Sequence, residues 1–168
     1  MTEIQSDTTD TAASVKCELA GEVLRSFGSL RFAATGWSML PTVWPEDTLV
    51  VERITSDRVR VGDIVLVGRG GRLCAHRLAS KAESSGKAFW ITQGDAMPAP
   101  DRPVSEDELL GRVVYLIRAG KLMAVPTRLS VAERVTAKIV RRSVPAVRAL
   151  VYLRRVVQGP KESVPCQG

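Results

Sequence analysis

The sequence predicts a mainly β domain of short antiparallel strands, with one helix before it and basic amphipathic helices after it. Between about residues 30 and 125, turn signals recur every 8 to 12 residues, which favours a closed or partly open β architecture over alternating strands and helices. Helical spacing of apolar residues is confined to the two ends. With 168 residues and 45% hydrophobic content, the chain is long enough for one folded domain.

The first helix is expected over residues 15–28. Apolar residues recur at Val15, Leu19 and Val23, and Gly28 stands where a helix would end. Residues 1–14 are rich in Thr, Ser and Asp and lack the basic start and apolar run of a signal peptide. We therefore expect a disordered lead over residues 1–14.

The β domain is expected over residues 29–126. Its strands are predicted at residues 30–34, 48–52, 64–67, 72–78, 88–92, 113–118 and 121–125, from alternation, buried runs and flanking turn residues. Hairpin loops are predicted at residues 68–71 and around Ala119-Gly120. Ser105 and Glu108 have the spacing of a capping box and predict a short helical turn.

Helical spacing returns over residues 127–158, where Val131, Val135 and Ile139 form a stripe and Pro145 interrupts it. Gly159-Pro160 begins a flexible tail, residues 159–168. Between Arg128 and Val157 there are eight Lys/Arg against one Glu, whereas the net charge of the whole chain is +6. The basicity therefore belongs to this segment.

We weigh three interpretations of the basic segment. The most ordinary is a pair of helices that pack their apolar stripe on the β domain and leave a solvated basic face. The second is peripheral contact with an anionic membrane surface. Nucleic-acid binding ranks last because the segment has no interleaved aromatic residues and matches no known binding module.

Cysteine usage and hydropathy bear on the compartment. Cys17, Cys74 and Cys166 form no CxxC pair, which argues against a zinc site and a disulfide framework. No window approaches the roughly 20 apolar residues of a membrane-spanning helix. We expect a cytoplasmic protein, in contact with a membrane at most from its inner face, and no metal or other cofactor.

Residues 35–42, Thr-Gly-Trp-Ser-Met-Leu-Pro-Thr, are suited to displaying a nucleophile. Gly36 and Pro41 allow a sharp turn around Ser38 at the end of a strand. A serine hydroxyl needs a positioned base, and His76 is the one histidine of the chain. Taken singly, Ser38 is more often a turn residue, and His76 a core histidine.

Four motifs occur together: Gly36-Trp-Ser-Met-Leu-Pro41, Gly62-Asp-Ile-Val65, His76-Arg77, and Gly94-Asp-Ala-Met-Pro-Ala-Pro-Asp101 followed by Leu109-Leu-Gly-Arg-Val113. In order and spacing they resemble the type I signal peptidases, in the archaeal and endoplasmic-reticulum-type branch that has histidine followed by arginine. The resemblance covers residues 30–125 and implies the signal-peptidase/LexA-like β fold.

The resemblance implies a serine endopeptidase that acts on an extended peptide or protein substrate. Ser38 matches the nucleophile, His76 the general base, and Asp95 and Asp101 the acids of the Gly-Asp loop. We favour Asp101 as the residue that orients His76, because an Asp directly after Gly94 commonly caps its own backbone. Gly36 departs from the family, which often has a serine there to assist the oxyanion hole.

Two alternatives remain open. A catalytically silent relative would bind an extended peptide or associate with a membrane, but would have no chemical need for the Ser/His/Asp set. A self-cleaving LexA-like repressor is disfavoured because we identify no DNA-binding domain and because that family uses a lysine base. Lys81 and Lys87 lie beyond the strand where this base is expected.

Overall fold

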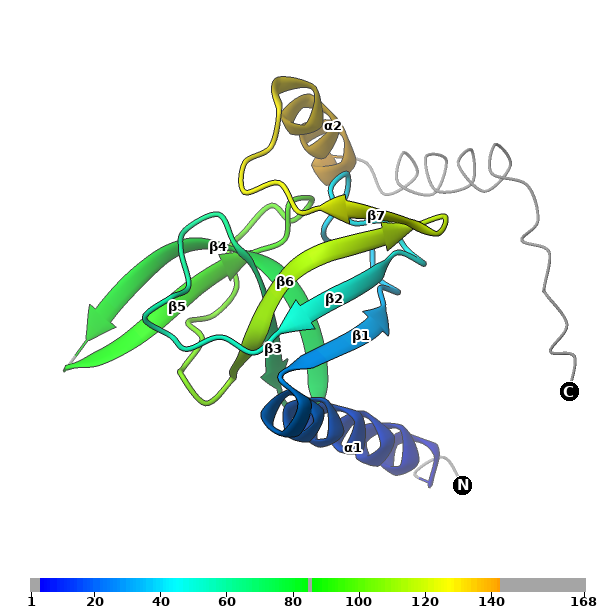
Figure 1. The fold of residues 1–168 in the computed structure, drawn as a ribbon, viewed down its shortest axis with the longest axis vertical. Helices are drawn as coiled ribbons and strands as arrows, with labels where there is room; N and C mark the ends of the chain where they lie inside the picture. Colours follow the sequence, from blue (N-terminus) through cyan, green and yellow to red (C-terminus); the bar gives the residue numbers. More distant parts are fainter. Residues whose placement is uncertain (1–3, 85, 143–168) are drawn as a thin grey trace, which may run out of the picture.

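The computed structural model describes residues 4–84 and 86–142, which form seven antiparallel strands in one sheet and two helices (Figure 1). This confirms the mainly β prediction. The elements are α1 (Ile4–Phe27), β1 (Ser29–Ala33), β2 (Thr48–Glu52), β3 (Ile64–Arg69), β4 (Arg72–Ser84), β5 (Lys87–Gln93), β6 (Leu109–Arg118), β7 (Lys121–Ala124) and α2 (Val131–Arg142).

The strands follow the order β1-β2-β6-β3-β4-β5. β7 lies outside this order and pairs with the last residues of β6, Tyr115–Arg118. β3 is an inner strand, and both of its faces are covered. Ile64 and Leu66 pack into one apolar cluster, whereas Val65 and Val67 pack into a second. This explains the continuous apolar run that predicted β3, since a strand buried on both faces has no polar side.

Helix α1 begins at Ile4, so the expected disordered lead is wrong for residues 4–14, which are helical. No Gly or Pro interrupts the sequence from Ile4 until Gly21, and the helix therefore continues towards the N-terminus. The end is as expected. Gly28 has a φ of 72° and its N–H donates to the carbonyl of Leu24 at 3.1 Å.

The structure refines the predicted hairpin at residues 68–71, the strand that follows it and the turn at Ser105. The turn between β3 and β4 is only Gly70-Gly71, and both glycines have positive φ, as a two-residue hairpin turn requires. β4 continues six residues past the predicted end at Leu78 and pairs with β5. The Glu108 carboxylate accepts the Ser105 N–H at 2.9 Å, but this segment is a turn rather than a helix.

Helix α2 lies at the end of the sheet opposite α1 (Figure 1). Its apolar stripe is exposed: Val131, Val135 and Ile139 are 76%, 53% and 56% accessible, whereas Ala137 is buried. The expected packing of this stripe on the β domain is therefore wrong for α2. The predictions for residues 143–168 lie outside the described residues, and no helix in the described part is long and apolar enough to cross a membrane.

Candidate active site

Ser38 lies where the chain leaves β1 and enters a tight turn. The Leu40 N–H donates to the Trp37 carbonyl at 3.1 Å, and the Val43 N–H donates to the Met39 carbonyl at 2.9 Å. Met39 and Leu40 are buried, which fixes the turn to the core. Ser38 is thus held in a fixed turn that follows β1, as the sequence predicts.

His76 lies on β4 opposite Val65 of β3, and its side chain is buried. Its Nε2 atom is 2.9 Å from the Ser38 hydroxyl oxygen, and its Nδ1 atom is 2.5 Å from a carboxylate oxygen of Asp101. The structure therefore brings together three of the four predicted site residues in a linear array of hydroxyl, imidazole and carboxylate.

Asp101 is held by residue Thr92 on the adjacent strand β5. The Asp101 N–H donates to the Thr92 carbonyl at 2.8 Å, and the Thr92 hydroxyl donates to the same carboxylate oxygen that faces His76, at 2.7 Å. Thr92 is fully buried, whereas the Asp101 side chain is 33% exposed, so this contact is partly buried. The sequence analysis missed Thr92, whose one signal is its inward position on an alternating strand.

Asp95 lies in a separate, buried ion pair. Both of its carboxylate oxygens accept hydrogen bonds from Arg77, at 2.8 and 2.9 Å, and the Thr42 hydroxyl donates to it at 2.6 Å. Arg77 also donates to the carbonyls of Gly62 and Pro126. Asp95 therefore joins β4 to the turn that follows Ser38, whereas Asp101, the acid that the sequence analysis favoured, is the one in contact with His76.

Arg69 supports the loop that carries Asp101. Its guanidinium donates two hydrogen bonds to the Glu108 carboxylate, from Nε at 2.5 Å and from Nη2 at 2.6 Å. It also donates to the carbonyls of Arg102 and Pro103. Such planar, paired contacts fix geometry as well as charge. Sequence reasoning gave Arg69 no role, since it stood only as a loop residue of the predicted hairpin.

The surroundings of His76 and Asp101 favour an ionised pair. Burial alone would lower the pKa of His76, but its hydrogen bonds with Asp101 and Cys74 outweigh that effect and raise it to about 9. Burial alone would raise the pKa of Asp101, but hydrogen bonds from His76 and Thr92 hold it below its usual range. The pKa of His76 therefore lies above the ordinary histidine value of about 6.5.

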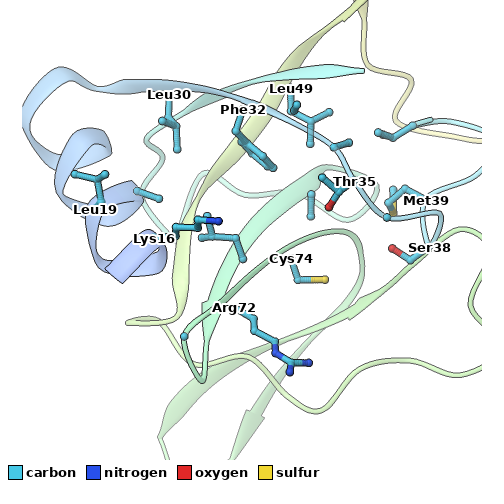
Figure 2. A pocket seen from close by; sticks show the side chains of 18 of the residues that line it. Lys16, Leu19, Leu30, Phe32, Thr35, Ser38, Met39, Leu49, Arg72 and Cys74 are labelled. Carbon is cyan, nitrogen blue, oxygen red and sulfur yellow. The ribbon is translucent and has the colours of Figure 1, made fainter. Parts of the chain in front are cut away.

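An apolar cavity of about 730 Å³ opens beside Ser38. It is bounded by β1, by residues 34–39, by the start of β4 and by one side of α1 (Figure 2). β1 and β4 are separated in the sheet by β2, β6 and β3, yet both line this cavity. The sheet therefore curls around the cavity, and Ser38 lies on its wall.

Gly36 lies on the same wall, and a Cβ atom at this position would meet no atom within 4 Å. The space that a side chain would need is open. Gly36 therefore offers no side-chain donor beside the Ser38 hydroxyl.

Comparisons with protein-family models, with curated proteins and with solved structures find no match to this chain. Within residues 4–84 and 86–142, no cluster of His, Cys, Asp and Glu could hold a metal ion.

Proposed function

We propose that the protein is a serine endopeptidase that cleaves an extended peptide through Ser38. The observation that carries this proposal is the array in which His76 lies 2.9 Å from the Ser38 hydroxyl and 2.5 Å from the Asp101 carboxylate. In its neutral form, His76 accepts the serine proton at Nε2 while its Nδ1–H donates to Asp101.

The reaction has two halves. The Ser38 oxygen attacks the scissile carbonyl carbon as His76 takes its proton, and the resulting imidazolium is stabilised by Asp101. His76 then returns the proton to the leaving amine, which departs and leaves an acyl ester on Ser38. A water molecule, deprotonated by His76, attacks that ester, releases the new carboxyl end of the substrate and regenerates the serine.

An extended peptide suits the strand next to Ser38. β1 pairs only with β2 among the described strands, so its other backbone edge can accept a substrate strand. The same strand lines the cavity beside Ser38. The order of the four sequence motifs supports a fold of the signal-peptidase/LexA-like type, which we propose together with the activity.

The experiment is labelling by a serine-directed acylating probe, combined with an assay for peptide cleavage. We expect Ser38→Ala and His76→Ala to lose labelling and cleavage, while Ser80→Ala, at an exposed position of β4, retains both. If the wild-type protein binds peptides but neither labels nor cleaves, the catalytically silent binding module is the better description. Labelling that persists in Ser38→Ala would exclude Ser38 as the nucleophile.

The exposed face of α2 favours a second property, contact with an anionic membrane surface. Arg134 and Lys138 are exposed, as is the stripe of Val131, Val135 and Ile139, so α2 presents both cationic and apolar side chains outside the β domain, as an interfacial helix does. Sedimentation with vesicles that contain phosphatidylglycerol tests this. Val135→Glu should abolish sedimentation, whereas Val61→Glu, at an equally exposed position of the β domain, should not.

A further inference from the structure

Helix α1 forms one wall of the cavity beside Ser38. Lys16, Leu19, Ala20 and Val23 have the spacing of one helix face, and all four line the cavity that contains Ser38. Leu19 is 60% exposed there, which leaves an apolar side chain uncovered at the cavity opening. In Figure 2, Lys16 and Leu19 extend from α1 on one side of the cavity, while Ser38 and Met39 lie on the other.

Two glycines of the β3–β4 hairpin fix α1 in this place. A Cβ atom on Gly68 would lie 2.6 Å from the Cys17 sulfur, and one on Gly71 would lie 2.9 Å from the Ser14 nitrogen. A side chain at Gly71 would meet the backbone of α1, and one at Gly68 would displace the Cys17 side chain that lies against the hairpin. The close approach therefore requires these glycines, and α1 lies on the side of the cavity opposite Ser38 (Figure 2).

The charges of the cavity are of one sign. Among the described residues that line it, Lys16 and Arg72 carry the only formal charges, and all the others are apolar or uncharged. Arg72 lies four residues before His76 on β4, and therefore about 13 Å from it along an extended strand. A substrate strand that passes Ser38 and runs along β4 would reach Arg72 about four residues from the scissile bond, and Lys16 lines the same cavity from α1.

We infer that this cavity binds an apolar segment of the substrate ending in an acidic residue, with Leu19 against the apolar side chains and Lys16 and Arg72 around the carboxylate. This inference deepens the proposed function and rests on it for the position of the scissile bond. The recognised partner is thus a peptide of defined chemistry, an extended apolar stretch that carries Asp or Glu at its far end.

The test measures binding of fluorescent peptides to the full-length Ser38→Ala protein by anisotropy, so that cleavage does not interfere. Two peptides share one apolar stretch and end in Glu or in Lys. We expect the Glu peptide to bind at least tenfold more tightly, and Lys16→Glu to cancel or reverse that preference. Lys138→Glu makes the same change of charge on α2 and should leave the preference intact.

The apolar wall is tested in the same assay. Leu19→Glu should weaken binding of both peptides at least tenfold, whereas Phe27→Glu, at an exposed site on α1 that does not line the cavity, should not. Equal binding of the two peptides, or equal effects of Lys16→Glu and Lys138→Glu, would overturn the inference.

The same peptides separate this inference from the proposed function. They are incubated with the protein that retains Ser38, and the products are identified by mass spectrometry. Selective binding without cleavage would refute the peptidase activity and retain the binding site. Cleavage without any preference for the acidic end would refute the binding site and retain the activity, and peptides that neither bind nor are cleaved would refute both.

Discussion

The backbone of Gly94 lies directly against that of Ser38. A Cβ atom at position 94 would come within 2.6 Å of the Ser38 carbonyl oxygen and within 3.1 Å of His76 Nε2. The same carbonyl accepts the Ala96 N–H at 2.8 Å. The Gly-Asp loop therefore fixes the position of the turn that carries Ser38 relative to the His76 imidazole. A glycine is required at position 94 because the two backbones are in contact there.

This contact predicts that Gly94→Ala separates Ser38 from His76. We expect kcat/KM for a cleavable peptide to fall at least about 100-fold and the free energy of unfolding to fall by about 1–3 kcal/mol, as in other overpacked sites. Peptide cleavage and urea unfolding measure the two effects. Gly36→Ala, where the added methyl group meets open space, is the matched control and should change neither by much.

A second substitution tests the oxyanion hole. Because the space beside Gly36 is open, Gly36→Ser can place a hydroxyl two residues before Ser38, the proposed nucleophile, without displacing a neighbour. An added donor to the oxyanion should raise kcat about tenfold or more, with little change in KM. A rate equal to that of Gly36→Ala would show that this hydroxyl does not reach the oxyanion.

The pKa of His76 predicts an alkaline pH profile. In the proposed mechanism the base is the neutral imidazole, and a pKa raised to about 9 leaves His76 mostly protonated at neutral pH. The value of kcat/KM should therefore rise about tenfold per pH unit from about pH 6.5 and level off above about pH 9. A midpoint near 6.5 would contradict this.

Cys74 provides a variant for the same profile. Its hydrogen bond is one cause of the raised pKa of His76, so Cys74→Ala should move the midpoint of the kcat/KM profile to lower pH. Cys17→Ala, which removes the other described thiol, should leave the midpoint unchanged. Equal midpoints in Cys74→Ala and the wild type would show that the thiol does not act on the imidazole.

Most of the β architecture could be predicted from local signals. β2 has the bounds that its sequence pattern indicates, and the turn at Ala119-Gly120 joins β6 and β7 as expected. Turn residues and alternation are properties of neighbours in the chain. The curling of the sheet around a cavity could not be predicted in this way, because it depends on which strands pair across long stretches of sequence.

The candidate site also has residues that local sequence signals predict and residues that only the fold identifies. Ser38, His76 and Asp101 were found because each lies in a motif that is readable in the sequence. Thr92 and Arg69 act through contacts with Asp101 and its loop, made across strands, and nothing in their immediate sequence marks them. The exposed stripe of α2 was misjudged because helical spacing indicates an apolar face but does not say what covers it.

The buried ion pair between Arg77 and Asp95 predicts that Arg77 stabilises the fold. Arg77→Met leaves a buried carboxylate without its guanidinium and removes the donors to Gly62 and Pro126. The free energy of unfolding, measured in urea, should fall by roughly 3 kcal/mol.

The matched control for Arg77→Met is Arg112→Met. Arg112 lies 3.7 Å from Asp63 and is partly exposed, so its loss should cost no more than about 1 kcal/mol. Asp95→Asn combined with Arg77→Met should cost less than the sum of the single changes, because the two side chains stabilise each other. Additive costs, or equal costs for Arg77→Met and Arg112→Met, would show that the Arg77–Asp95 pair does not hold the Ser38 turn to β4.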